Sequence, residues 1–292
     1  MGSLSYLPQI LVSGIGIGCV YGLIGIGFCV IYNASGIVNF AQGAFVMLGG
    51  MVSFVLMQRV GLPLPLAALI AIAGVAALGV VIERLVVRPL WNRNATMFVM
   101  ILATLAAQIV VERSTLILVG DQPKTLPMFT DRPPLMIGGV AISYQLLWIV
   151  GCSLAVVGLL ALFFRTTRTG KAMRAVAIDR EAAALQGIPV SRMLALAFAL
   201  SAALGAIGGI LITPTQFTAF DIGVPFAISG FIAAIVGGFG RPFGAFLGGL
   251  TLGVIQSVAI VSFGAGLKNV AALSVLLIFL FIRPSGILGP AK

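Results

Sequence analysis

The sequence predicts an all-α protein, a polytopic transmembrane helix bundle of about eight or nine spans. Hydrophobic residues make up 60% of the 292 residues and charged residues only 8%, whereas soluble domains carry about 25% charged residues. The mean hydropathy is +1.19, and most apolar residues lie in runs of about 20, the length that crosses a bilayer. We therefore expect residues 1–292 to form a single transmembrane domain.

Apolar runs follow one another along the whole chain. Most are of bilayer length, but the run at 224–238 is shorter. Such a run is a full span, a half-helix or a re-entrant segment, so the number of spans is eight or nine. The runs are residues 8–32, 40–57, 64–87, 96–119, 144–164, 192–212, 224–238, 243–263 and 268–283.

The positive charges indicate the orientation of these spans. Segment 165–192, the longest polar interval, carries six basic residues but only Asp179 and Glu181 as acids. Cytoplasmic loops are rich in Lys and Arg, so we place this segment in the cytoplasm. With nine spans, the N-terminus is then outside, segment 120–143 is an external loop and the C-terminus is cytoplasmic. Twelve of the 17 basic residues lie inside, and the others are Arg59, Arg113, Lys124, Arg132 and Lys268.

A short helix with defined ends is expected within the central segment. Asp179 suits the N-cap position, because its carboxylate accepts hydrogen bonds from the free N–H groups of the first turn. Residues 180–186 are mostly strong helix formers, Gly187 suits the left-handed position after a helix, and Pro189 prevents its continuation. An apolar face is predicted at Ile178, Ala182 and Leu185. We interpret this helix as a docking element; the alternative is a solvated loop with one helical turn.

Residues 32–43 (YNASGIVNFAQG) interrupt the first two apolar runs with polar side chains. At membrane depth, irregular backbone persists where it is buried in protein or lines a water-filled cavity. Asn33, Asn39 and Gln42 are the densest polar group between apolar flanks, so we expect them to line a translocation route. The alternative is a tight structural turn in which these amides act as caps.

Glycines recur at every fourth position of the first run, at Gly14, Gly18 and Gly22. Small residues at this spacing let two helix backbones approach each other closely. We therefore predict a helix–helix contact along this face.

Several classes of chemistry find no support. The chain has no His, and its three Cys residues lie inside apolar runs without metal-ligand spacing. A nucleotide-binding P-loop around Lys171 would need Gly at 165 and Ser or Thr at 172, positions that Arg165 and Ala172 occupy. We expect no cofactor and no metal. The basic residues flank apolar runs instead of forming one patch, so we expect contact with membrane lipid and not with nucleic acid.

Acidic residues within the spans are few. Glu83 precedes Arg84 at a cytoplasmic helix end, and Glu112 precedes Arg113 toward an outer end. We expect both pairs to be anchors or ion pairs. A proton-coupled carrier places acids near the midplane of the membrane, and the sequence shows none there.

Three stretches of the sequence together resemble one family. The pattern Glu181-Ala182-Ala183-x-x-x-Gly187 resembles the front half of the EAA loop of ABC importer permeases, and the later part of that motif is not matched. The stretches SGIVNFAQGAFVMLGG (35–50) and GGFGRPFGAFLGG (237–249) resemble the LivH-type permeases of branched-chain amino acid importers. The resemblance extends over essentially the whole chain.

This resemblance implies a permease subunit in the bacterial inner membrane that imports branched-chain or other hydrophobic amino acids and forms half of the translocation path. It implies a LivM-like sister permease, two cytoplasmic ABC ATPase subunits and a periplasmic substrate-binding protein. The partner subunits then hydrolyse ATP, and the chain itself is not an enzyme. Residues 165–190 become a cytoplasmic coupling loop. The implied coupling residues are Asp179, Arg180, Glu181, Ala182, Ala183 and Gly187.

Two alternatives remain open. Relatives with this pattern also carry urea, short amides or aromatic acids. A stand-alone secondary carrier is a different class of protein, and it predicts midplane acids or selectivity rings that the sequence does not show.

Overall fold

The computed structural model describes residues 7–283 and 285–288. The charge distribution predicts the side of the membrane for each chain end, but both ends, including Lys292, lie outside the described residues. The helices are α1 (Leu7–Ser35), α2 (Gln42–Val60), α3 (Leu64–Ile82), η2 (Glu83–Val87), α4 (Arg88–Asn92), α5 (Met97–Val119), α6 (Tyr144–Thr166), α7 (Arg168–Ile178), α8 (Arg180–Leu185), α9 (Val190–Ile212), α10 (Gly223–Gly237), α11 (Pro242–Phe263), η3 (Ala265–Leu267) and α12 (Lys268–Ile282).

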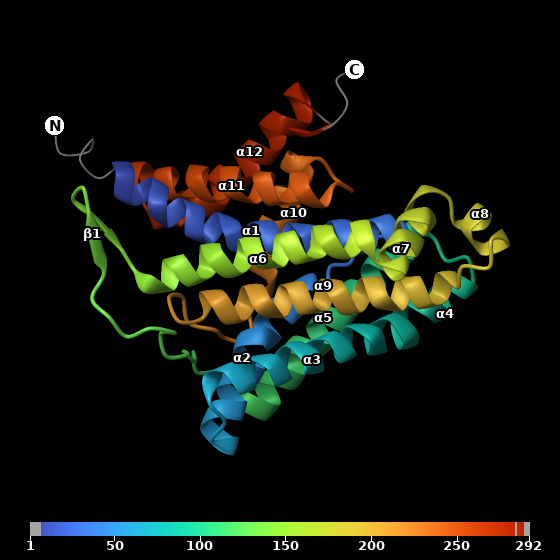
Figure 1. The fold of residues 1–292 in the computed structure, drawn as a ribbon, viewed down its shortest axis with the longest axis horizontal. Coiled ribbons are helices and arrows are strands. Elements are labelled where there is room, and N and C mark those ends of the chain that lie inside the picture. Colours follow the sequence, from blue (N-terminus) through green and yellow to red (C-terminus); the bar gives the residue numbers. More distant parts are fainter. Residues whose placement is uncertain (1–6, 284, 289–292) are drawn as a thin grey trace.

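The long helices confirm the predicted class of fold. Within the described residues, eight helices are long and apolar enough to cross a membrane, and they lie side by side in one elongated bundle (Figure 1). The predicted ends agree within a few residues, except that the third span continues through η2 and α4 to Asn92. Helix α10 has 15 residues, about 22 Å, so the short seventh run forms a helix of less than bilayer length.

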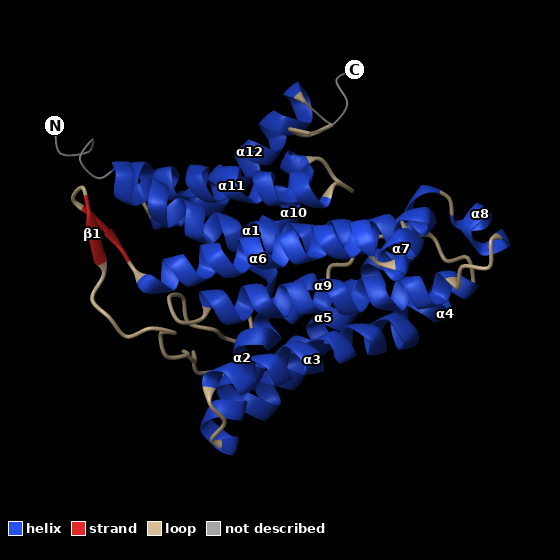
Figure 2. Cartoon of the chain, viewed as in Figure 1, coloured by secondary structure: helices blue, strands red, loops and turns tan. Residues whose placement is uncertain are grey.

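The loop between α5 and α6, which the charge distribution predicts to be external, departs from a purely helical structure. Strands β1 (Leu135–Ile137) and β2 (Val140–Ile142) form an antiparallel hairpin in which Leu135 pairs with Ile142. Gly138 and Gly139 connect the strands with φ values of +58° and +82°, and a two-residue turn with two positive φ values favours glycine at both positions. The hairpin projects from one end of the helix bundle (Figure 2). The loop therefore contains a β-hairpin that the apolar pattern did not predict.

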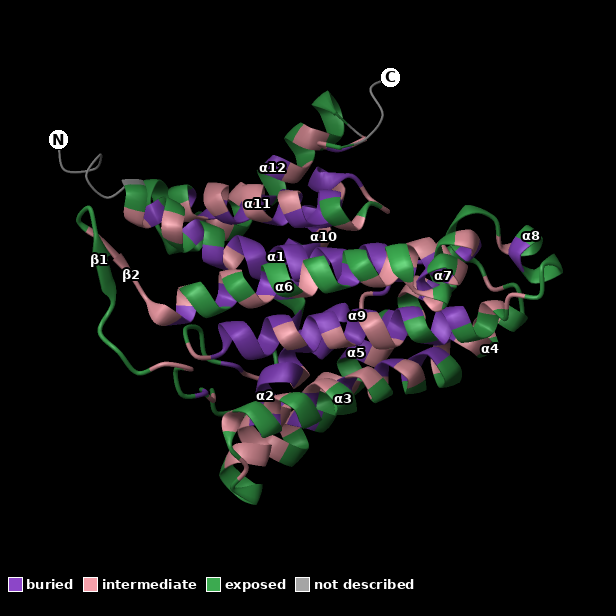
Figure 3. Ribbon diagram, viewed as in Figure 1, coloured by how far each residue is buried: buried purple, intermediate pink, exposed green. Residues whose placement is uncertain are grey.

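Helix α1 lies at the centre of the bundle. It contacts α6, α9, α10 and α11, and most of its residues after Gly16 are buried (Figure 3). The predicted glycine face is confirmed. Side chains at Gly14, Gly18 and Gly22 would meet the backbone or side chains of α11, where Gly249 and Gly253 oppose them. Two helices with glycine on both sides thus pack backbone to backbone.

We expect Gly249→Leu to break this interface. A Cβ atom at Gly249 would collide with the backbone nitrogen of Gly22, and overpacking of this kind costs about 1–3 kcal/mol. The apparent Tm of the purified chain should fall by several degrees. Gly158→Leu is the matched control, because a Cβ atom at this exposed position of α6 meets nothing within 4 Å. Equal Tm values for the two variants would contradict the close packing of α1 on α11.

Two helices begin inside the bundle. The Gln42 amide, in the first turn of α2, lies against Gly27. Gly27 precedes the end of α1 by eight residues, about 12 Å along the helix axis, so the chain turns back into the bundle before α2 starts. Helix α10 begins at Gly223, whose carbonyl group packs on Gly43. The first turns of α2 and α10 therefore meet in the interior.

Candidate functional site

Helix α8 has the ends that the sequence predicts. The Asp179 carboxylate accepts a hydrogen bond from the backbone N–H of Ala182 at 2.9 Å. Gly187 has a φ of +78°, and its N–H donates to the carbonyl of Ala184 at 2.9 Å. The helix lies at the far end of the bundle, opposite the β-hairpin (Figure 1). Cap chemistry alone thus defines a short helix in an exposed loop.

Two side chains hold α8 against the rest of the chain. Ala183 is buried, and the Arg180 guanidinium lies 4.8 Å from the centre of the Trp91 ring. A Cβ atom at Gly36, just after α1, would lie 2.8 Å from an Arg180 nitrogen. Partial burial lowers the pKa of Arg180 from its usual value. Arg180 therefore faces α4 and the break between α1 and α2, and not the solvent.

The opposite side of α8 is uncovered. Leu185 is 87% exposed, and Glu181 and Ala182 are exposed beside it. Ile178 is also 87% exposed, but it ends α7 and extended Asp179 separates it from α8, so the predicted apolar face does not lie on one helix. Large apolar side chains outside the membrane at this exposure indicate a surface for protein contact. The predicted residues thus divide into two caps, two anchors and an outward face.

Helix α7 is an element between two spans that the sequence analysis missed. Thr167 caps it by accepting a hydrogen bond from Gly170 at 2.9 Å, and the helix buries Gly170, Met173 and Val176. It packs against α6, α1 and α9. The spacing of these three residues, with Thr167 before them, is the signal that could have revealed an amphipathic helix. Helix α7 links the end of α6 to α8.

The three predicted route residues do not form one cluster. Asn33 donates to the carbonyl of Gly240 at 2.7 Å, at the turn between α10 and α11. Gln42 is fully buried; it donates to the Ser201 carbonyl at 3.1 Å and accepts from the Ser201 hydroxyl at 2.6 Å. Asn39 accepts from Ala41 N–H, and its buried amide nitrogen has no partner among the described residues. These contacts favour the cap interpretation for Gln42 and leave Asn39 with a free donor.

A polar stripe on α5 completes the interior site. Thr104, Gln108 and Glu112 lie at intervals of four residues on one side of α5. The Thr104 hydroxyl accepts from Phe40 N–H at 3.2 Å, and the Gln108 carbonyl oxygen accepts from Ala44 N–H at 2.8 Å. The Gln108 amide group donates to Glu112 at 2.6 Å. Helix α5 therefore supplies the N-terminal cap that α2 lacks in its own sequence.

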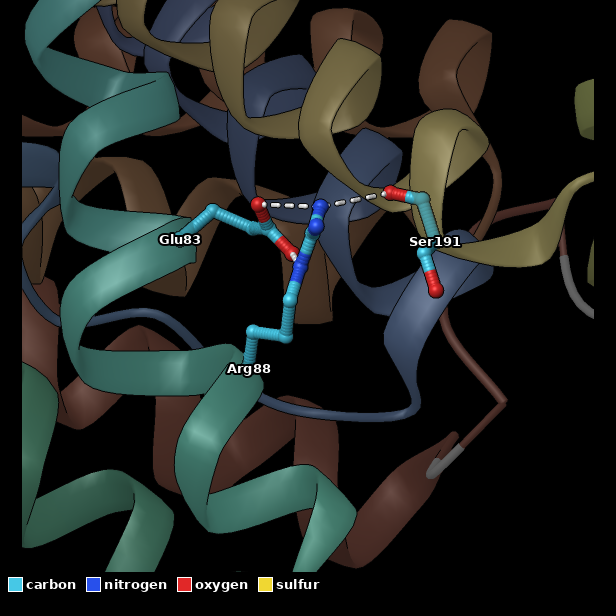
Figure 4. A network of polar contacts seen from close by, with 3 residues as sticks. All are labelled: Glu83, Arg88 and Ser191. Carbon is cyan, nitrogen blue, oxygen red and sulfur yellow. Dashed lines mark hydrogen bonds and ion pairs between the residues drawn. The ribbon is translucent and has the colours of Figure 1, made fainter.

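Glu83 forms the one ion pair among the described residues. It is fully buried, and both of its carboxylate oxygens accept from Arg88 at 2.9 Å. Arg88 also donates to the carbonyl of Ser191 at 3.1 Å, at the start of α9 (Figure 4). Glu83 is in an ion pair, but its partner is Arg88 and not the adjacent Arg84. This network joins the end of the third span to α9. Glu112 and Arg113 form no ion pair among the described residues.

The sequence matches the family described as "Branched-chain amino acid transport system / permease component" over residues 10–282. The chain belongs to this family. It is 34% identical to the high-affinity branched-chain amino acid transport system permease protein BraD of Pseudomonas aeruginosa, over 97% of this chain and 96% of that protein. It is 31% identical to the corresponding permease protein LivH of Escherichia coli, with the same coverage.

A solved structure shows the same fold. A chain of PsaBC from Streptococcus pneumoniae in complex with Fab superposes with a TM-score of 0.53 at 16% identity, over 96% of this chain and 92% of that chain. The family consists of ABC importer permeases, which work with ATPase and other subunits. The protein is therefore a multi-pass transport component of the inner membrane and not an enzyme.

Proposed function

We propose that this chain is the permease subunit of an ATP-driven importer for branched-chain or other hydrophobic amino acids and forms half of the translocation path. The observation that carries the proposal is the family match over residues 10–282, and the uncovered face of α8 at one end of the bundle adds to it. The alternative is a permease of the same family that transports urea, short amides or aromatic acids, and a test of substrates distinguishes the two.

Uptake by a reconstituted complex tests this function. The chain is co-purified with the subunits encoded beside it and placed in proteoliposomes with ATP inside. We expect leucine uptake that needs ATP and that isoleucine and valine inhibit, while the chain alone hydrolyses no ATP. Inhibition by urea, acetamide or benzoate but not by isoleucine would assign the alternative substrates. Leucine uptake by the chain without ATPase subunits would support a secondary carrier instead.

The proposed partners are a LivM-like sister permease, two cytoplasmic ABC ATPase subunits and a periplasmic substrate-binding protein. Helix α5 supports a sister permease, because its outward face is apolar except for exposed Arg113 and Ser114. Arg113 lies six residues before the end of α5, about 9 Å into the membrane. Charges at such depth face other protein chains or water and not lipid. We assign this face to the sister subunit.

The coupling loop at residues 165–190 supplies the proposed contact with an ATPase subunit. Asp179 and Gly187 fix the ends of α8, while Arg180 and Ala183 fix its position on the permease. Glu181 and Ala182 are exposed and free to meet a partner. The six residues thus act together, although only some of them would touch the ATPase.

We also propose that the N-terminus is outside and the C-terminus cytoplasmic. This orientation places α7 and α8 in the cytoplasm and the β-hairpin outside (Figure 1). In a Cys-free background, we expect Ala175→Cys on α7 to resist an impermeant thiol reagent in intact cells and to react in inverted vesicles. Gly139→Cys, in the hairpin turn, is the matched outside variant. Labelling of position 175 in intact cells would reverse the topology.

The translocation path is proposed to pass the interior junction of α2 and α10, beside Asn39 and Gln42. The unpaired amide nitrogen of Asn39 supports this, because an unsatisfied buried donor costs about 1–3 kcal/mol unless a mobile group reaches it. Asn33 was expected in the path as well. Its hydrogen bond to Gly240, at the turn before α11, supports a structural role for Asn33 instead.

Two variants test whether Asn39 and Gln42 line the translocation path or act as structural caps. We expect Asn39→Cys to react with small thiol reagents at a rate that depends on the nucleotide state of the complex. Gln42→Leu removes the two hydrogen bonds that join α2 to Ser201 of α9, so it should lower the Tm, at a cost of about 1–3 kcal/mol. If the Asn39→Cys variant is inert in every nucleotide state while Gln42→Leu is destabilised and normally active, both residues are structural.

A further inference from the structure

A groove runs between α6 and α11 at the cytoplasmic half of the bundle. Its volume is about 290 Å³. Val157, Leu160, Ala161 and Phe164 of α6 form one wall, and Phe243 of α11 forms part of the other. Leu160 is buried, whereas Ala161 is exposed and Phe243 is 61% exposed. Ile26 and Asn33 of α1 complete the lining, so the groove is apolar along α6 and α11, has one amide on the α1 side, and is open toward the outside of the bundle.

The position of the groove matches the inner leaflet of the membrane. Val157 and Phe164 are seven residues apart on α6, so the apolar wall extends about 10 Å along the helix. It ends two residues before Thr166, where α6 finishes and the cytoplasmic helix α7 begins. In the proposed orientation, this wall faces acyl chains just below the head groups.

A cation closes the cytoplasmic end of the groove. Arg174 of α7 lines the groove, and the carboxylates of the described residues form no ion pair with it. Lys171 lies three residues earlier on α7 and does not line the groove. Basic pockets between spans on the cytoplasmic side bind anionic lipid head groups. The combination of an apolar wall with a cation at its surface end fits an amphiphile with a negative head group.

We propose that this groove binds an anionic phospholipid of the inner leaflet. One acyl chain lies between α6 and α11, and the phosphate group lies at Arg174. An acidic surface of an ATPase subunit would also attract Arg174, but it would leave the wall at Ala161 and Phe243 without an apolar partner. Free phosphate likewise matches only the cationic end. The site is separate from α8, whose outward face is formed by other residues.

Native mass spectrometry of the purified full-length chain tests the proposal. The chain is titrated in detergent with phosphatidylglycerol and, separately, with phosphatidylcholine. We expect preferential retention of phosphatidylglycerol, and we expect Arg174→Gln to weaken it about fivefold, the effect of one cation near an anionic surface. Ala161→Phe fills the groove and should weaken it as well. Lys171→Gln removes an equal charge from the same helix outside the groove, and it should change retention less than about twofold.

The controls separate the possible occupants. Each variant should keep the wild-type Tm, because these side chains are exposed. Excess inorganic phosphate should not displace the lipid if the apolar wall contributes. Equal retention of both lipids, wild-type retention by Arg174→Gln, or full displacement by phosphate would each overturn the proposal. So would an Arg174→Gln variant that retains phosphatidylglycerol normally but no longer assembles with the ATPase subunits.

Discussion

Arg88→Met is expected to lower the free energy of unfolding by about 3–5 kcal/mol, because it leaves a buried charge without its partner. Glu83 is fully buried, and Arg88 provides both hydrogen bonds to its carboxylate. The same substitution removes the bond to the Ser191 carbonyl, which joins the third span to α9. Thermal unfolding of the purified chain, followed by intrinsic fluorescence, measures the change.

Two further variants make this prediction specific. Arg84→Met removes a neighbouring exposed cation and should leave the Tm close to that of the parent chain. Combining Arg88→Met with Glu83→Leu should restore most of the lost stability, since replacing both members of a buried pair by apolar residues is often neutral. If Arg84→Met destabilises the chain as much as Arg88→Met does, the pairing is wrong.

Leu185→Asp is expected to reduce ATP-driven uptake by about 30-fold or more while the chain remains folded. Leu185 is 87% exposed, so the substitution disturbs no packing within the permease. If α8 docks into an ATPase subunit, the new carboxylate enters an apolar contact, and losses of about 2 kcal/mol or more are typical of central interface residues. Co-purification of the ATPase subunits with the permease, together with ATP-dependent uptake, measures the effect.

Matched changes on the same helix test the interpretation. Leu185→Met keeps the apolar contact and should retain uptake, whereas Gly187→Val strains the left-handed position at φ +78° and should weaken coupling through the shape of the helix end. A Cβ atom at Gly187 meets no other part of the chain within 4 Å, so the expected effect comes from local backbone strain and not from a clash with a neighbouring element. Wild-type uptake and assembly by Leu185→Asp would remove α8 from the coupling surface.

The sequence predicted the spans and the ends of α8 because these features depend on local chemistry. Hydrophobic length determines a span, and the cap at Asp179 and the left-handed Gly187 act within a few residues of the helix that they terminate. The hairpin between α5 and α6 escaped prediction, although its Gly138–Gly139 pair is a turn signal, because strands of three residues carry too short a pattern of alternation.

The contacts of the interior site could not be predicted, because they join distant segments. The partner of Gln42 is Ser201, 159 residues away, and the cap of α2 comes from Gln108. The partner of Glu83 depends on the π-helical turn η2. In an α-helix, a residue five positions on points away, whereas a π-helical turn brings positions i and i+5 together. Arg88 therefore replaces the neighbour that the sequence suggested.

The stacking of Arg180 on Trp91 has a mechanical consequence. A cation over an aromatic face is attracted by the whole ring, so the guanidinium can slide across the indole without breaking a bond of fixed direction. On its other side, the same group lies against Gly36, where a backbone with no side chain offers a hard stop. Helix α8 can thus shift along the face of the Trp91 ring, whereas the backbone at Gly36 limits its movement in that direction. In the proposed complex, an ATPase subunit that moves α8 would therefore press Arg180 against the segment before α2.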